Sequence, residues 1–154
     1  MEIIYCCYAG AHTSITAAAL HVGLLDPSAK PTLSDILALP NFDTTSQGQI
    51  GRVFKFGVDQ LGNNVYVAAL GPARQATLSA LKLMLQESGV RKQETLIVNA
   101  LSCVSLGVRV GGFLSRRLGF VGIGRPMCAQ GIVRHFECFE KLVVEARQAS
   151  HNNP

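Results

Sequence analysis

Short apolar runs alternate along the chain with longer segments in which apolar residues recur at helical spacing. The first run, residues 2–8, contains Ile and Tyr and ends at Ala9-Gly10, which predicts a buried strand. A helix is predicted next over residues 13–24, with Thr13 or Ser14 as N-cap and Asp26-Pro27 as its stop. The chain therefore opens with a strand that leads through a polar corner into a helix.

The middle of the chain has the pattern of a hairpin followed by a helix. A short helix closed by Pro40 and a polar loop come first. Two strands that flank "QLGN" then predict an antiparallel hairpin over residues 52–70. Residues 72–88 follow as a helix, because Pro72 suits its first turn, leucines form a stripe and Gly89 ends it.

The last third predicts two more strands, each followed by a helix. Residues 95–101 and 119–124 have the composition of core strands, and residues 103–117 and 127–147 that of helices. Together the elements predict an α/β fold, a three-layer sandwich whose five-stranded sheet is mostly parallel with one antiparallel hairpin. We expect one domain over residues 1–148 and a disordered tail over residues 149–154.

Composition narrows the classes of partner. Of 154 residues, 48% are hydrophobic and 16% charged, and the basic residues behind the net charge of +4 are scattered. Trp is absent and aromatics are few, so a nucleic-acid partner is not expected. The chain has no apolar run of about 18 residues, the length of a membrane helix, so we expect no membrane partner. No basic residue precedes the first short apolar run, so we expect no signal peptide and a cytoplasmic protein.

The five cysteines predict free thiols, because a cytoplasmic protein keeps its cysteines reduced. We therefore expect no intrachain disulfide. No CxxC pair occurs, and the adjacent Cys6 and Cys7 are poorly spaced as zinc ligands. His135 and Cys138 lie one helical turn apart and are interpreted as part of a solvated face. We predict neither a metal nor a cofactor.

Polar residues follow three of the predicted strands, at the edge where α/β proteins bind ligands. Gly10, His12, Thr13 and Ser14 follow the first strand, where unpaired helix amides favour anions. The other two strand ends contribute Asn99, Ser102 and Arg125. These residues predict a site for a small anionic ligand that bears phosphate. Each also has a plainer interpretation, as a helix cap, a surface arginine at a turn or a structural histidine.

Two patterns of phosphate chemistry can be compared with the corner. A Walker loop fails, because both of its glycines and its lysine are missing. Low-molecular-weight tyrosine phosphatases have a strand-end Cys, five residues, then Arg and Ser or Thr; Cys6, His12 and Thr13 match that spacing. His12 is not Arg, however, and no late Asp-Pro loop follows. Cys6 and His12 are therefore candidate catalytic residues, and whether the protein is an enzyme is left open.

Glycines mark the helix predicted over residues 103–117. Gly107, Gly111 and Gly112 lower helix propensity, which indicates close packing of this helix on the sheet. A homodimer face built on these small residues is the alternative. A non-enzymatic interaction or regulatory protein, with this helix and Arg116-Arg117 facing a partner, is thus a second functional hypothesis beside anion binding.

Several longer motifs resemble a known family. "AGAHTSITAAALHVGLL", "FGVDQLGNNVYVAALG" and "VGGFLSRRLGFVGIGRP" are similar to segments of uncharacterised proteins from spore-forming Firmicute bacteria, a domain of unknown function. The resemblance covers roughly residues 2–145. It implies a cytoplasmic bacterial protein, with sporulation as a context, in which the "GAHTS" corner belongs to a family pattern. It assigns no catalytic residue.

Overall fold

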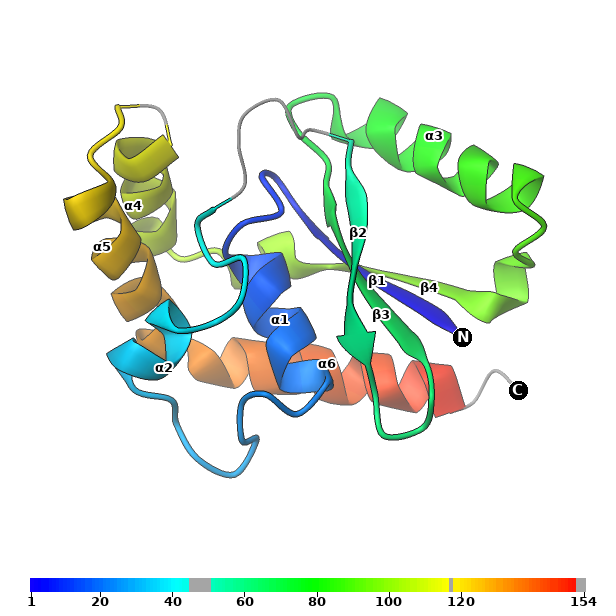
Figure 1. Cartoon of the computed structure of the whole chain (residues 1–154), viewed down its shortest axis with the longest axis horizontal. Helices are drawn as coiled ribbons and strands as arrows, with labels where there is room; N and C mark the ends of the chain where they lie inside the picture. Colours follow the sequence, from blue (N-terminus) through cyan, green and yellow to red (C-terminus); the bar gives the residue numbers. More distant parts are fainter. Residues whose placement is uncertain (45–50, 117, 152–154) are drawn as a thin grey trace.

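The computed structural model describes residues 1–44, 51–116 and 118–151 and is a mixed α/β fold (Figure 1). Its sheet has four strands in the order β2-β3-β1-β4. The central strand β1 (Glu2–Cys7) runs parallel to β3 (Asn64–Ala69) on one side and to β4 (Thr95–Asn99) on the other. The edge strand β2 (Val53–Val58) pairs antiparallel with β3, which confirms the hairpin.

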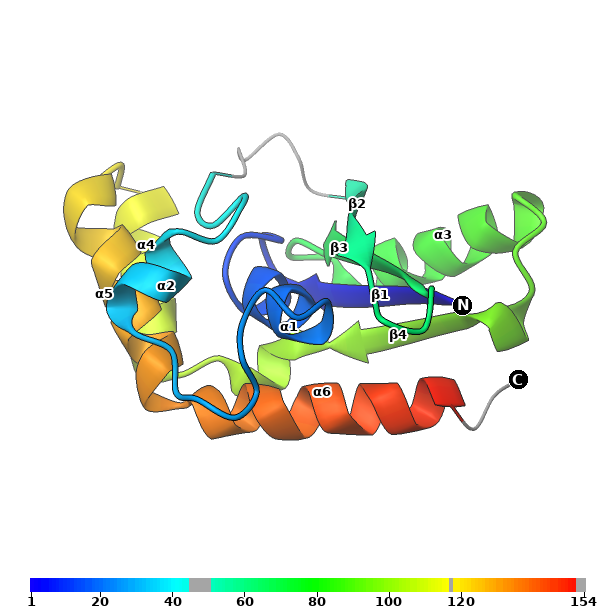
Figure 2. The same cartoon turned by 60° about the horizontal axis from the view of Figure 1, so that its bottom comes forward.

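Helices cover both faces of the sheet (Figures 1 and 2). On one face, Ile3 and Tyr5 of β1 pack in the larger core with α1 (Thr13–His21) and α6 (Phe136–His151). On the other face, Ile4 and Cys6 pack in a smaller core with Leu81 of α3 (Arg74–Glu87). Successive side chains of a strand point to opposite faces, so β1 supplies both cores and is buried from Ile3 to Cys7.

The prediction of a fifth strand over residues 119–124 is wrong. The segment is a short turn that leads into α5 (Val121–Arg134). Phe120 and Ile123 are exposed, whereas a central strand would bury them. The physical reason is that this apolar run is too short, and too interrupted by glycines, for the spacing of its apolar residues to distinguish a strand from the first turn of a helix. The sheet therefore has four strands instead of the expected five, and a smaller share of its strands run parallel.

The predicted last helix is two helices. α5 ends at Arg134 and α6 begins at Phe136, with His135 between them in a non-helical conformation. Two short helical segments, α2 (Leu33–Leu37) and the 3₁₀ turn η2 (Lys92–Glu94), lie in the connections. α6 continues to His151, three residues into the predicted tail, and residues 152–154 lie outside the described residues. So does most of the polar loop expected before the hairpin.

The glycines of α4 (Leu106–Arg116) serve close packing as predicted, but against α5 instead of the sheet. A Cβ atom on Gly111 would lie 2.7 Å from both the Cys128 amide nitrogen and the Gly124 carbonyl oxygen of α5. One on Gly124 would in turn lie 2.4 Å from the Ser115 nitrogen. The two helix backbones therefore touch, and α4 and α5 form a compact helical hairpin at one end of the molecule (Figure 1).

The expectation that all cysteines stay free is wrong for one pair. Cys103, in the 3₁₀ turn η3 (Ala100–Cys103), forms a disulfide with Cys138 of α6, with Cα atoms 5.6 Å apart. The two residues are 35 positions apart, and only the packing of η3 on α6 brings them together. Cys138 is thus half-buried and bonded, not part of a solvated face. The described residues contain no cluster of His, Cys, Asp or Glu that could hold a metal.

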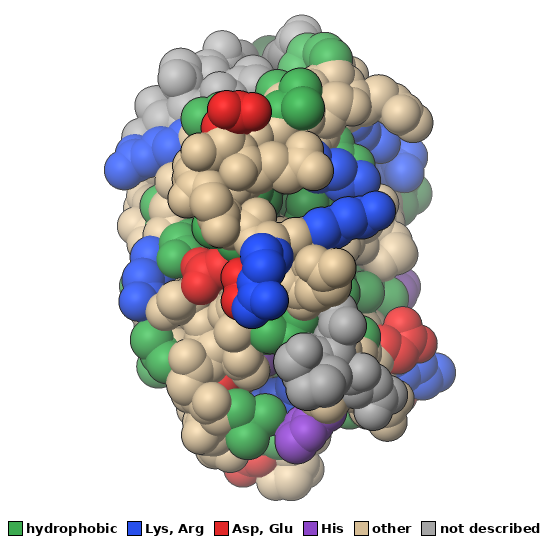
Figure 3. All heavy atoms as spheres, turned by 90° about the vertical axis from the view of Figure 1, so that its right-hand side faces the viewer, with side chains coloured by type: hydrophobic (Ala, Val, Ile, Leu, Met, Phe, Trp, Pro, Cys, Tyr) green, Lys and Arg blue, Asp and Glu red, His purple; other side chains and the backbone are tan. Residues whose placement is uncertain are grey.

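The surface is unevenly charged. The end of the molecule near the chain termini shows Lys or Arg beside Asp or Glu side chains, with small apolar groups between them (Figure 3). Arg91 and Glu94, for example, form an exposed ion pair. Among the described helices, none combines the length and the apolar character needed to cross a bilayer.

Candidate functional site

Cys7 lies at the carboxyl end of β1, where the chain turns towards α1. Its Sγ accepts a hydrogen bond from the Gly10 amide at 3.1 Å and lies 3.0 Å from Ser14 Oγ. Gly10 has a φ of +62°, and a Cβ atom there would lie 3.2 Å from the Cβ of Ala69. Glycine suits this position because it adopts a left-handed conformation without strain and lets the loop pass close to β3. The loop between β1 and α1 therefore bends around the Cys7 thiol.

The first turn of α1 begins directly above this thiol. His12 is the N-cap residue, in place of the predicted Thr13 or Ser14, and its side chain makes no capping hydrogen bond. The first amides of a helix have no partner within the helix. Thr13 and Ser14 are both buried, so their amides and hydroxyls belong to the interior of the corner. This is the local geometry that favours a bound anion.

The His12 ring contacts a carboxylate that the sequence did not single out. Nε2 lies 2.8 Å from Asp43 Oδ1, and Ser115 of α4 donates a hydrogen bond to the other carboxylate oxygen. The Phe42 ring packs edge-on against His12, with centroids 5.3 Å apart. The corner is therefore held from two sides, by the turn at Asp43 and by α4.

The turn that contains Asp43 has an uncommon backbone conformation. Asn41 and Asp43 have φ values of +62° and +57°, and the Asp43 amide donates to the Ala11 carbonyl at 3.0 Å. Asn and Asp are the non-glycine residues that adopt this left-handed conformation most readily. An Asn and an Asp after Pro40 signal a turn, but His12 is 31 positions away, and sequence spacing alone does not join the two.

The other predicted site residues have partners of their own. The Asn99 side chain accepts from the Leu101 amide at 3.1 Å and caps η3, and the Ser102 hydroxyl donates to the Asn99 carbonyl. Arg125 lies on α5 instead of following a strand, and its Nη2 donates to the Leu37 carbonyl at 2.8 Å. Gly10, His12, Thr13 and Ser14 thus come together at the corner, while Asn99, Ser102 and Arg125 are engaged elsewhere.

Cys6 and Cys7 are neighbours with different surroundings. Cys6 faces the smaller core, and its thiol donates to the Val98 carbonyl at 3.3 Å. Burial, with a smaller effect from Cys7, raises the pKa of Cys6 to about 11. The Cys6 thiol therefore stays protonated at neutral pH, so it is a poor nucleophile. The strand-end thiol that faces the corner is Cys7, one residue later than the sequence spacing suggested.

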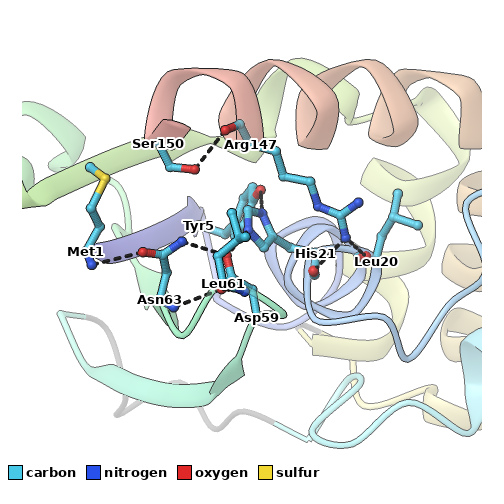
Figure 4. Close-up of polar contacts among 9 residues, drawn as sticks. All are labelled: Met1, Tyr5, Leu20, His21, Asp59, Leu61, Asn63, Arg147 and Ser150. Atoms are coloured by element: carbon cyan, nitrogen blue, oxygen red, sulfur yellow. Dashed lines mark hydrogen bonds and ion pairs between the residues drawn. The ribbon is translucent and has the colours of Figure 1, made fainter. Parts of the chain in front are cut away.

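A second buried network ties the opposite end of α1 to the sheet (Figure 4). Tyr5 Oη lies 2.6 Å from His21 Nδ1, and His21 Nε2 lies 3.2 Å from Asp59 Oδ2. A carboxylate only accepts, so the Nε2 proton points to Asp59 and Tyr5 donates to Nδ1. Burial lowers the pKa of His21 and raises that of Tyr5.

Arg147 of α6 completes this network by donating to the Leu20 and His21 carbonyls at the end of α1. Asp59 in turn accepts from the Leu61 and Asn63 amides in the hairpin turn. The network therefore fastens α1, the hairpin and α6 together, and we assign it a structural role.

The corner is closed to solvent in this structure. Cys7 is 4% exposed and His12 7% exposed. Two surface grooves lie elsewhere: one beside α6 at Val144 and Arg147, the other between Leu24 and Pro40. A ligand would reach the corner only if its cover, the Asp43 turn or α4, moved.

Comparison with known proteins adds a family but no activity. One family model, described as "Protein of unknown function (DUF3189)", matches residues 2–148. The comparisons with curated proteins and with solved structures give no match. The match agrees with the resemblance to a domain of unknown function, while the bacterial group and motifs of that resemblance stay predictions. The function has to be argued from the corner itself.

Proposed function

Because the chain belongs to the DUF3189 family, which is described only as of unknown function, we propose from the geometry that its β1–α1 corner binds a small oxyanion such as a phosphate group. The observation that carries the proposal is the convergence of the Gly10 amide and the Ser14 hydroxyl on Cys7. An amide donor from the loop and a hydroxyl from the helix start thus meet at one place, as in anion sites at helix N-termini.

The helix supplies the electrostatic part of the argument. The aligned peptide dipoles place a partial positive charge at the start of α1, and the side chain of the N-cap residue His12 makes no capping hydrogen bond there. An oxyanion bound at Thr13 and Ser14 would accept charge-assisted hydrogen bonds, each contributing about 1.5–3 kcal/mol. Ser14 would turn its hydroxyl from the thiol to the ligand.

His12 would add a charge that the backbone lacks. Asp43 holds the ring by Nε2, which is the arrangement that fixes the orientation of a functional histidine. When protonated, the ring would bring a positive charge to the corner, one residue before the position that arginine holds in the phosphatase pattern counted from Cys7. Asn99, Ser102 and Arg125 are left out of the proposal, since each makes a hydrogen bond outside the corner.

Calorimetric titration with phosphate and thermal melts in its presence test the proposal. Wild-type protein should bind phosphate and melt at a higher temperature with it. Ser14→Ala and His12→Ala should each weaken binding roughly tenfold or more, the equivalent of about 1.4 kcal/mol.

Cys6→Ser is the matched control for this experiment. It makes a small change at a neighbouring buried residue that faces the other core, so it should leave phosphate affinity unchanged. Equal affinities in wild type, Ser14→Ala and His12→Ala would show that the anion, if any binds, is held somewhere else.

The environment of Cys7 favours a second candidate function, phosphatase-like thiol chemistry. Counted from Cys7, five residues precede Thr13, and Ser14 stands where the phosphatase pattern has its hydroxyl residue. The Cys7 thiolate would form a sulfur–phosphorus bond while the bond to the leaving alcohol breaks, and the alcohol would take the proton that the thiol gave up. Water would then cleave the sulfur–phosphorus bond, releasing phosphate and restoring the thiol.

Hydrolysis of p-nitrophenyl phosphate separates this candidate from binding alone. Cys7→Ser should abolish turnover and keep phosphate affinity, whereas Cys6→Ser should retain turnover. Because Thr13 replaces the arginine of the phosphatase pattern, we expect turnover to be slow. Turnover that survives in Cys7→Ser, or is absent from the wild type, would rule out the thiol mechanism and leave the binding proposal standing.

A further inference from the structure

Large apolar side chains are exposed at the tip of the α4–α5 hairpin. Phe120 is 57% exposed and Ile123 65% exposed, and Leu118 and Val121 beside them are also exposed. Water-facing apolar groups concentrated in one short stretch mark an interaction surface, because single exposed residues are ordinary but clusters are costly. We refer to residues 118–123 as the hairpin tip.

The exposed apolar surface continues along the outer side of α4. Leu106, Val110 and Phe113 recur at helical spacing and are all exposed. Arg109, also exposed, lies on the same side of the helix. α4 turns its glycines to α5 and its large side chains outward, so the outward face has no partner within the described residues.

The stretch of chain that forms this hairpin is basic in sequence, and Arg109 and Arg134 are exposed on it. Residues 95–136 contain no Asp or Glu and five arginines: Arg109, Arg116, Arg117, Arg125 and Arg134. The opposite end of the molecule mixes both signs (Figure 3). A second copy docked by the same face would bring arginines against arginines, whereas an anionic surface would complement them.

The position of the apolar residues favours one kind of anionic partner, a lipid bilayer, over another protein. The apolar side chains lie on a projecting hairpin and line neither of the two grooves described above (Figure 1). Apolar side chains at the end of a helical hairpin can enter a deformable surface without needing a matching groove on it. Apolar residues beside arginines are also the composition of segments that lie in the interface of a bilayer.

From this combination we propose that the α4–α5 hairpin docks on anionic lipid bilayers, with the tip residues entering the headgroup region. The sequence-based expectation of no membrane partner came from the lack of a spanning segment, and surface docking does not need one. Two contributions favour binding to the bilayer: the attraction of arginines to anionic lipid and the burial of the apolar tip residues. We expect binding to require both. The inference is independent of the anion site at the corner.

Vesicle co-sedimentation with the full chain tests the proposal. Vesicles of phosphatidylglycerol and phosphatidylcholine should bind the protein, and pure phosphatidylcholine should bind it far less. Binding should weaken at high salt, which screens the charges. Arg109→Ala should lower the partition coefficient roughly fivefold, the equivalent of about 1 kcal/mol per basic residue.

Two apolar substitutions give a matched comparison. Ile123→Ser in the tip should lower vesicle binding several-fold, whereas Leu83→Ser on α3, where the leucine is 60% exposed, should leave it unchanged. Absence of binding at any phosphatidylglycerol content would overturn the proposal. So would equal losses in the two variants, or a dimer in solution that Ile123→Ser dissociates.

Discussion

At the scale of single residues, the corner depends on which way each side chain of β1 points. Cys6 and Cys7 are adjacent, yet one thiol lies in the smaller core and the other under the first turn of α1. Strand alternation could have made this distinction in the sequence, because Cys7 shares the side of Ile3 and Tyr5. Asp43 could not have been found in that way, since its contact with His12 arises only from folding.

Asp43 provides the prediction at this scale. Asp43→Ala should lower the free energy of unfolding by about 2–4 kcal/mol, because His12 and Ser115 lose a buried partner and alanine is strained at this φ. Asp43→Asn should cost less, since asparagine accepts hydrogen bonds and tolerates the left-handed conformation. Urea denaturation measures both. Equally small losses in the two variants would mean that the pair contributes little.

At the scale of elements, the α4–α5 hairpin is held by backbone contact. Gly111 and Gly124 leave no room for a Cβ atom, so the two helices approach more closely than larger residues would allow. Such packing gives the hairpin a fixed shape although its outer side chains are exposed. The hairpin can therefore present the same tip to a partner each time.

Two glycine substitutions test this packing. Gly111→Ala should destabilise the protein by about 1–3 kcal/mol, because its new methyl group would meet backbone atoms of α5 that cannot move aside. Gly122→Ala, where nothing lies within 4 Å, should instead stabilise α5 by up to about 1 kcal/mol. Thermal or urea denaturation of both variants checks the signs. The same sign for both would contradict the packing described.

At the scale of the whole molecule, buried networks join elements that are distant in the chain. The Tyr5–His21–Asp59 network connects β1, α1 and the hairpin turn, and Arg147 adds α6. The Cys103–Cys138 disulfide fastens α6 a second time, at η3. The network and the disulfide thus tie α6 to both ends of the sheet and hold the fold together.

His21 makes the stability of the molecule depend on pH. Burial lowers the pKa of His21 in the folded protein, so below the usual value of about 6.5 the unfolded chain binds the proton more readily. Stability should therefore fall as the pH drops below about 6.5. His21→Gln should cost stability at pH 8 and reduce the slope below pH 6.5. An unchanged slope, measured by urea denaturation across this range, would mean that another group is responsible.

The sequence predicted the parts of the fold that have a clear period or a clear stop. β1 was found from its apolar run, the hairpin from its turn residues, and α3 from its leucine stripe and Gly89. Residues 119–124 were misassigned because three apolar residues among glycines fit a strand as well as a helix start. The disulfide and the His12–Asp43 pair each join residues more than 30 positions apart, and local patterns carry no information on such pairs.

A crystal soaked in tungstate tests the central claim most directly, because this heavy oxyanion is located by its anomalous scattering. The account predicts a peak at the β1–α1 corner, within hydrogen-bonding distance of the Thr13 and Ser14 amides and next to Cys7, with the Asp43 turn or α4 displaced to admit it. The same soak of Ser14→Ala should give a weaker peak. A corner that stays closed and empty while tungstate binds elsewhere, for example at the arginines of α4 and α5, would contradict the account.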